Sequence, residues 1–209
     1  MEKKRIIFDI DYTLLEPNYH REKAFFRQVT PHSGEYFFTH MGDILKDYES
    51  RYSFYNKDQL LWHLNQYSNV PLPPYFIEDW FQFNTDLDPQ PMEEAKRVLA
   101  YLQEKEYEIV ALTNWFKEPQ EEKLRVVGIR SYFDEIYGGD TFLKPNPESY
   151  RVAMGKHKAE ECCIVGDDYL NDIQGAAFVG LDGIYLERKE EPKCSAPKIK
   201  RLGELKKYL

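Results

Sequence analysis

The chain has 209 residues, of which 42% are hydrophobic and 15% aromatic, so it is long and apolar enough for a sizeable buried core and is not intrinsically disordered. Its net charge is -8, and basic residues cluster only at residues 3–5 and 198–207. This charge argues against binding to the phosphate backbone of nucleic acids.

Three cysteines, Cys162, Cys163 and Cys194, show no CxxC spacing and no even-numbered disulfide framework. The N-terminus is charged from Glu2 onward, the apolar run after it is too short for a signal peptide, and no later segment is apolar enough to span a bilayer. We therefore expect a protein of the reducing cytoplasm with no membrane partner, in which Cys162 and Cys163 are small apolar residues of a buried strand.

The first predicted strand, residues 5–8, is followed by an aromatic-rich stretch in which no run is typical of a buried parallel strand. We interpret residues 15–88 as an inserted helical domain, broken internally by prolines at 71–74. Its aromatic residues are expected to form its own core, although stacking on a nucleobase is the alternative. Pro89 and Pro91 mark the return to the main domain, which comprises residues 1–14 and 89–209.

From residue 92 onward, segments with helical periodicity alternate with short apolar runs. Helices are predicted at residues 93–104 and 119–127, the second closed by Gly128, and further strands at residues 109–112, 135–137, 162–165 and 183–186. This alternation predicts an α/β fold with a mostly parallel sheet covered by helices on both faces.

Asp9 and Asp11 follow the first strand at alternate positions, with Thr13 two residues further on. Because residues i and i+2 of an extended segment share a side, both carboxylates can face one crevice at the strand end. Their repulsion is relieved by a divalent cation or by a proton on one of them, and both solutions suggest catalysis. Taken alone, the pair can equally be a strand end followed by a turn.

Two further segments supply groups suited to a phosphate. Thr113 and Asn114 follow the second core strand and offer a hydroxyl and an amide, although a turn or helix cap would use the same residues. Lys144 precedes Pro145, and Asn146 with Pro147 is typical of the start of a helix. Most lysines are solvated, but this one stands beside a rigid Pro-Asn-Pro segment.

The strand at 162–165 ends in an acidic loop that contains Asp167, Asp168 and Asp172. Gly166 permits close backbone approach, and oxygen ligands at this density match Mg²⁺, whereas the alternative is a solvated acidic loop. Together the strand ends contain a nucleophile, an acid/base, phosphoryl-oxygen donors and ligands for a cation. These are the parts of a phosphoryl-transfer site.

The ordered set Asp9-Ile10-Asp11-Tyr12-Thr13, Thr113-Asn114, Lys144-Pro145 and Gly166-Asp167-Asp168 through Asn171-Asp172 resembles the four motifs of the haloacid dehalogenase superfamily. The motifs cover roughly residues 1 to 15 and 90 to 190. The resemblance implies a Rossmann-like core with a helical cap inserted after the first strand, and a Mg²⁺-dependent phosphatase acting on a small phosphorylated metabolite such as a sugar phosphate, a nucleotide or a phospho-acid.

The resemblance also implies a role for each motif residue. Asp9 is the nucleophile that forms an aspartyl-phosphate, and Asp11 is the acid/base. Thr113 and Asn114 bind the phosphoryl group, and Lys144 neutralises the negative charge shared by that group and Asp9. The metal is held by Asp9, the backbone carbonyl of Asp11 and Asp167, with Asp168 and Asp172 as further ligands or outer-shell groups.

Within this superfamily, dehalogenases that attack carbon lack the second aspartate of the first motif, so Asp11 favours phosphate esters. Tyr12 and Trp115 depart from the smaller residues that are frequent at these positions, and both rings would narrow the site. Two alternatives stay open. One is a phosphomutase with His20 as an acid/base in the cap, and the other is a non-catalytic protein that keeps the fold.

Overall fold

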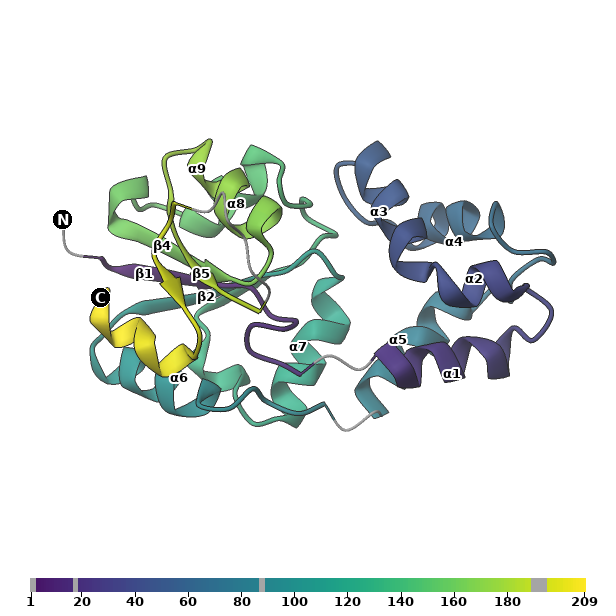
Figure 1. The fold of residues 1–209 in the computed structure, drawn as a ribbon, viewed down its shortest axis with the longest axis horizontal. Helices are drawn as coiled ribbons and strands as arrows, with labels where there is room; N and C mark the ends of the chain where they lie inside the picture. The colour runs from purple at the N-terminus through teal and green to yellow at the C-terminus, as the bar shows by residue number, and fades with distance from the viewer. Residues whose placement is uncertain (1–2, 17–18, 87–88, 189–194) are drawn as a thin grey trace.

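The computed structural model describes residues 3–16, 19–86, 89–188 and 195–209. In these ranges the core is a six-stranded sheet with the order β3-β2-β1-β4-β5-β6, and every neighbouring pair is parallel (Figure 1). The strands are β1 (Arg5–Phe8), β2 (Glu108–Leu112), β3 (Glu135–Tyr137), β4 (Cys162–Gly166), β5 (Asp182–Leu186) and β6 (Lys198–Ile199). The predicted α/β fold is confirmed.

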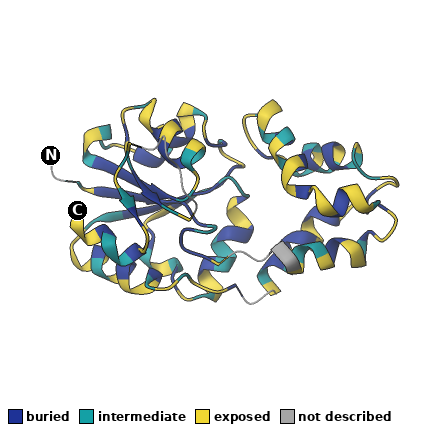
Figure 2. Cartoon of the chain, in the orientation of Figure 1, coloured by how far each residue is buried: buried dark blue, intermediate teal, exposed yellow. Residues whose placement is uncertain are grey.

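Alternate residues of the central strands face opposite layers of helices. Ile6 and Phe8 of β1 belong to the cluster that includes α6 (Ala95–Glu104) and Leu124 of α7 (Lys117–Val126). Ile7 belongs to the cluster on the other face, with α8 (Pro147–Met154) and α9 (Gly175–Ala177). Because side chains alternate along a strand, the three consecutive apolar residues of β1 pack against both faces. The sheet is accordingly buried on both sides (Figure 2).

Most of the predicted elements lie within two residues of their observed positions. The helix expected at 93–104 begins at Ala95, and the one expected at 119–127 begins at Lys117 and is followed by Gly128 with a φ of 72°. Asn146 caps α8 by accepting a hydrogen bond from the Glu148 amide at 3.0 Å, as its position before Pro147 predicts. The two-residue strand β6 was not predicted, since its sequence is too short to show periodicity.

The chain between β1 and α6 contains the inserted helical cap. Its helices are α1 (Tyr19–Val29), α2 (Glu35–Thr39), α3 (Met41–Arg51), α4 (Lys57–Asn65) and α5 (Phe76–Asp86), and Figure 1 shows them as a separate lobe beside the sheet. Phe26, Phe37, Phe76 and Trp80 are buried in the aromatic cluster of this lobe, with ring centroids 4.8 to 6.3 Å apart for four pairs. The expectation that these aromatic residues form a core is confirmed for this cluster.

The cap is hydrogen-bonded to the core on two sides. At the junction where the chain enters and leaves the cap, the Glu16 amide donates to the Gln90 carbonyl at 2.9 Å. On the other side, the Tyr55 amide donates to the Gly139 carbonyl at 2.7 Å, and the Leu143 amide donates to the Ser53 carbonyl at 2.8 Å. The loop between α3 and α4 is thereby attached to the loop that follows β3.

Cys162 and Cys163 are buried free thiols of β4, in agreement with their predicted place in an interior strand, and Cys194 lies outside the described residues. In the part of the chain that the structure describes, every helix falls short of the length or the apolarity needed to cross a membrane.

Neighbouring aromatic residues of α2 test the core of the cap. Phe37 is fully buried, whereas 53% of the surface of Tyr36 is exposed. Replacing Phe37 with alanine leaves a cavity and is expected to lower the free energy of unfolding by about 3–5 kcal/mol, whereas Tyr36→Ala should cost less than about 1 kcal/mol. Urea titration of both variants measures the difference, and equal effects would contradict a cap core centred on Phe37.

Candidate active site

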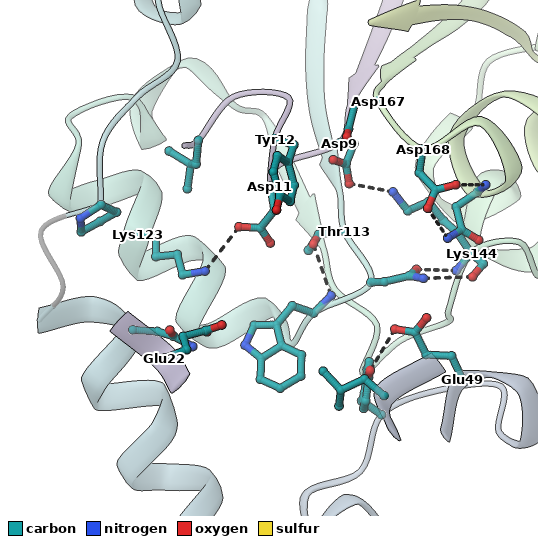
Figure 3. A pocket seen from close by; sticks show the side chains of 18 of the residues that line it. Asp9, Asp11, Tyr12, Glu22, Glu49, Thr113, Lys123, Lys144, Asp167 and Asp168 are labelled. Carbon is teal, nitrogen blue, oxygen red and sulfur yellow. Dashed lines mark hydrogen bonds and ion pairs between the residues drawn. The ribbon is translucent and has the colours of Figure 1, made fainter. Parts of the chain in front are cut away.

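A cavity of about 350 Å³ lies between the carboxyl ends of the strands and the cap (Figure 3). In a parallel sheet the carboxyl ends of the strands share one edge, so the polar residues that follow them converge. The cavity is lined by residues from all four predicted segments, namely Asp9, Asp11, Thr113, Asn114, Lys144, Asp167 and Asp168. Asp172 lies behind them, fully buried.

Lys144 is the cation at the centre of this arrangement. Its Nζ lies 2.8 Å from Asp9 Oδ1 and 2.6 Å from Asp172 Oδ1, and all three side chains are largely removed from solvent. Burial by itself would lower the pKa of Lys144, but the charges of Asp172 and Asp9 outweigh it, so the net shift is upward and the ammonium stays protonated. The lysine therefore bridges the end of β1 to the turn after β4.

Asp168 and Asp172 have different positions in the turn after β4. The carboxylate of Asp168 is exposed and caps the π-helical segment Tyr169–Gln174, accepting from the amides of Leu170 at 2.9 Å and Asn171 at 3.0 Å. Asp172 points inward, and a Cβ built on Gly166 would come within 2.1 Å of its Oδ2. A glycine at position 166 is thus required for Asp172 to reach Lys144.

Asp9, Asp167 and Asp172 each place a carboxylate oxygen within 4.8 Å of the others. Burial, together with the neighbouring negative charges, raises the pKa of Asp9 and of Asp167 to about 7. Burial also raises the pKa of Asp172, against the opposing effect of Lys144. Three hard oxygen donors with a single ammonium between two of them fit a divalent cation such as Mg²⁺, which would restore the ionised carboxylates.

Asp11 is held apart from this cluster, on the side of α7. The side-chain amide of Gln120 donates to Asp11 Oδ2, and Lys123 Nζ lies 3.4 Å from Asp11 Oδ1, as Figure 3 shows for the lysine. The same Gln120 nitrogen donates to Thr113 Oγ1 at 3.1 Å. Neither Gln120 nor Lys123 was predicted from the sequence. The two residues are one helical turn apart in α7, and this spacing alone does not point to Asp11.

Thr113 and Asn114 are both at the site but use their polar atoms differently. Thr113 Oγ1 accepts hydrogen bonds from Gln120 and from the Trp115 amide, so its proton can be directed into the cavity. The Asn114 side chain accepts from the Lys144 amide at 2.7 Å and donates to the Lys144 carbonyl at 3.0 Å. Asn114 therefore fixes the backbone of Lys144, a contact that the sequence did not reveal.

The two bulky residues noted in the motifs also line the cavity. Tyr12 has a φ of 63°, in the left-handed region that favours glycine, which accounts for the small residue often found at this position. The Trp115 ring packs against Trp80 of the cap at 4.7 Å between centroids. Trp115 thus joins the core to the cap as well as narrowing the cavity.

Two helices of the cap each contribute a carboxylate to the cavity, Glu22 of α1 and Glu49 of α3, which the sequence did not single out (Figure 3). Glu16, at the junction between core and cap, also lines the cavity. Trp80 Nε1 donates to Glu22 Oε1 at 3.1 Å, and the Tyr55 hydroxyl donates to Glu49 Oε1 at 2.9 Å. The side chain of His20, a candidate for an acid/base in the cap, lies outside the described residues.

Residues 6–185 match the profile of the haloacid dehalogenase-like hydrolases. The chain belongs to this family. Among solved structures, a putative hydrolase of the family from Bacillus subtilis, YfnB, bound to magnesium, superimposes with a TM-score of 0.74 at 21% sequence identity, covering 100% of this chain and 99% of that one. This likeness independently supports the fold of the hydrolase, including its cap.

Two relatives of this family member have named activities. A phosphoserine phosphatase of Thermus thermophilus is 30% identical over 120 residues, 54% of this chain and 47% of the relative, so the matched segment spans about half of that protein. A phosphoglycolate phosphatase of Aliivibrio fischeri is 28% identical over 195 residues, 88% of this chain and 83% of the relative.

The carboxylate cluster generates a prediction for stability. The pKa of Asp9 and of Asp167 is raised from 3.8 to about 7. In the pH range between these two pKa values, the folded state therefore binds more protons than the unfolded state. Metal-free protein should lose stability as the pH rises through this window. Because Mg²⁺ binds the ionised carboxylates, it should raise the melting temperature by a few degrees at about pH 8 and by less than about one degree at about pH 5.

Thermal melts with and without Mg²⁺ measure this effect. Asp167→Asn should lose the shift seen at the higher pH. The exposed cap residue Asp79 provides a matched control, because Asp79→Asn removes the same charge far from the cluster and should keep the shift. An equal effect of Mg²⁺ at both pH values would contradict cation binding to these carboxylates.

Proposed function

We propose that the chain is a Mg²⁺-dependent phosphomonoester hydrolase that acts on small phosphorylated metabolites through an aspartyl-phosphate on Asp9. The observation that carries the proposal is the pairing of Asp9 with the Lys144 ammonium at 2.8 Å, with Asp11 held separately at the edge of the same cavity. The named phosphatases among its relatives support the reaction class.

The residues proposed to hold Mg²⁺ are Asp9, the backbone carbonyl of Asp11 and Asp167. Asp172 is assigned to the outer shell, because it is fully buried behind the residues that line the cavity and pairs with Lys144 there. Asp168 is assigned to the outer shell as well, because its carboxylate caps the following turn. When bound, the cation would neutralise charge on the phosphoryl oxygens and on the carboxylates.

In the first step, a carboxylate oxygen of Asp9 attacks phosphorus and the bond from phosphorus to the ester oxygen breaks. Asp11 donates its proton to the departing alkoxide, so the alcohol leaves neutral. Lys144 stabilises the charge shared by Asp9 and the phosphoryl group, and the Thr113 hydroxyl donates to a phosphoryl oxygen. Asn114 is proposed to add a contact to the phosphoryl group while it holds the backbone of Lys144.

In the second step, Asp11 accepts a proton from a water molecule that attacks the phosphorus of the aspartyl-phosphate. The bond between the Asp9 oxygen and phosphorus breaks, inorganic phosphate is released, and both carboxylates return to their initial states. The contacts of Gln120 and Lys123 hold the carboxylate of Asp11 apart from those of Asp9 and Asp167, where it can exchange protons with the leaving group and with water.

Asp11 favours attack on phosphorus over attack on a carbon–halogen bond, because the second reaction needs no acid for its halide leaving group. The aspartates, Thr113 and Lys144 are all at the site, which favours an enzyme over a non-catalytic protein.

The proposed arrangement has residues 1–14 and 89–209 as the core domain and residues 15–88 as the cap that encloses the substrate. We also propose a cytoplasmic location, where buried thiols such as those of Cys162 and Cys163 stay reduced.

Replacement of the nucleophile is the direct test. Asp9→Asn should reduce release of phosphate from a panel of phosphate esters by about a thousandfold or more. Wild-type protein incubated with acetyl phosphate and Mg²⁺ should gain a phosphoryl group on Asp9, detectable by mass spectrometry after rapid acid quenching. Full turnover by Asp9→Asn would contradict the proposed mechanism. A wild-type protein that releases no phosphate from any ester of the panel would contradict it as well.

Gln120 is proposed as a positioning residue for Asp11. Gln120→Leu removes the donor to Asp11 and Thr113, so kcat should fall roughly tenfold while KM stays within about twofold. The reason for this split is that Asp11 acts on protons, while Thr113 keeps its hydrogen bond from the Trp115 amide. Gln66→Leu, at an exposed position of the cap, is the matched control. An increase in KM alone would contradict the assigned role.

A further inference from the structure

The side of the cavity formed by the cap is acidic. Glu22 and Glu49 line it, with Glu16 at the junction to the core, and the two basic residues among the described lining residues, Lys123 and Lys144, both come from the core. Figure 3 shows Glu22 beside Lys123 and Glu49 on the opposite side, below Lys144. A phosphomonoester with its phosphoryl group at Asp9 would therefore direct its leaving group toward carboxylates.

Each of these carboxylates is fixed by a cap side chain that also lines the cavity. The Trp80 indole nitrogen donates to Glu22, and the Tyr55 hydroxyl donates to Glu49. An ionised carboxylate offers about four acceptor positions, so both residues keep acceptor capacity for a ligand. Trp80 belongs to α5, and Tyr55 lies in the loop between α3 and α4, so the two carboxylates are held on two sides of the cavity.

Both carboxylates are buried enough that desolvation outweighs the attraction of the nearest core lysine. Burial raises the pKa of Glu22, and the charge of Asp11 adds to the shift in spite of Trp80 and Lys123. Burial likewise raises the pKa of Glu49, with a contribution from Asp168 that opposes Tyr55 and Lys144. A further anion in this desolvated space would be repelled, whereas an N–H or O–H donor would be attracted.

We propose that Glu22 and Glu49 select phosphomonoesters whose leaving group carries hydrogen-bond donors, hydroxyl or ammonium, and reject those whose leaving group carries a carboxylate. This inference rests on the proposed phosphatase function and specifies its substrate class. It separates this chain from its phosphoglycolate phosphatase relative, because the leaving group of phosphoglycolate carries a carboxylate.

Two pairs of substrates that differ in one carboxylate test the proposal. O-phosphoethanolamine is compared with O-phosphoserine, and 2-hydroxyethyl phosphate is compared with phosphoglycolate, each with Mg²⁺. The value of kcat/KM should be about tenfold or more higher for the carboxylate-free member of at least one pair. The first pair reports selection of an ammonium group, and the second reports selection of a hydroxyl group.

Variants then attribute the selection to the two residues. Glu22→Gln and Glu49→Gln should each lower the ratio within the preferred pair by about threefold or more, and the double variant should lower it further. Glu78→Gln, a change of the same kind at an exposed residue of α5 that lines a different groove, should leave the ratio unchanged. Because both substrates are measured on one preparation, partial unfolding of a variant cancels from the ratio.

The possible failures are distinguishable. Equal values within both pairs, a preference for the carboxylated members, or a ratio that stays constant in the double variant would overturn the inference while the phosphatase function stands. Hydrolysis of none of the four esters by a preparation that still hydrolyses acetyl phosphate would have the same meaning. A preparation that hydrolyses neither these esters nor acetyl phosphate would overturn the proposed function itself.

Discussion

The rest of the site depends on one buried ammonium, that of Lys144, held between the carboxylates of Asp9 and Asp172. A desolvated charge is stable only when it is paired, so each of the three residues needs the other two in place. They come from three separate segments of the chain. Asn114 fixes the backbone of the lysine, and Gly166 leaves room for Asp172, so the geometry of strands β1, β2 and β4 converges on this ion pair.

Residues whose position depends on local structure could be placed from the sequence. Asp9, Thr113, Lys144 and Asp167 follow predicted strands, and because parallel strands end at one edge, their convergence could be expected. The different orientations of Asp168 and Asp172 could not be predicted. They arise from a π-helical turn that Asp168 precedes and caps and in which the fourth residue, Asp172, points inward. Nothing in the pattern of three aspartates distinguishes them.

In the cap, too, the core could be predicted from the sequence but the residues at the cavity could not. Its aromatic residues indicated a helical insertion with its own core, since burial of many rings needs no knowledge of partners. Glu22 and Glu49, by contrast, are two among 36 acidic residues, and their meeting at one cavity follows from how α1 and α3 pack. Gln120 likewise reaches Asp11 across 109 positions of sequence, a contact that exists only in the folded chain.

The main-chain hydrogen bonds between the α3–α4 loop and the loop after β3 have a mechanical consequence. One of them is made by Leu143, the residue directly before Lys144. Any motion that lifts the cap on this side to admit an ester or discharge an alcohol must break that bond, and so must act on the segment that carries the lysine. Opening of the cavity on this side and the position of the Lys144 ammonium are thus mechanically coupled.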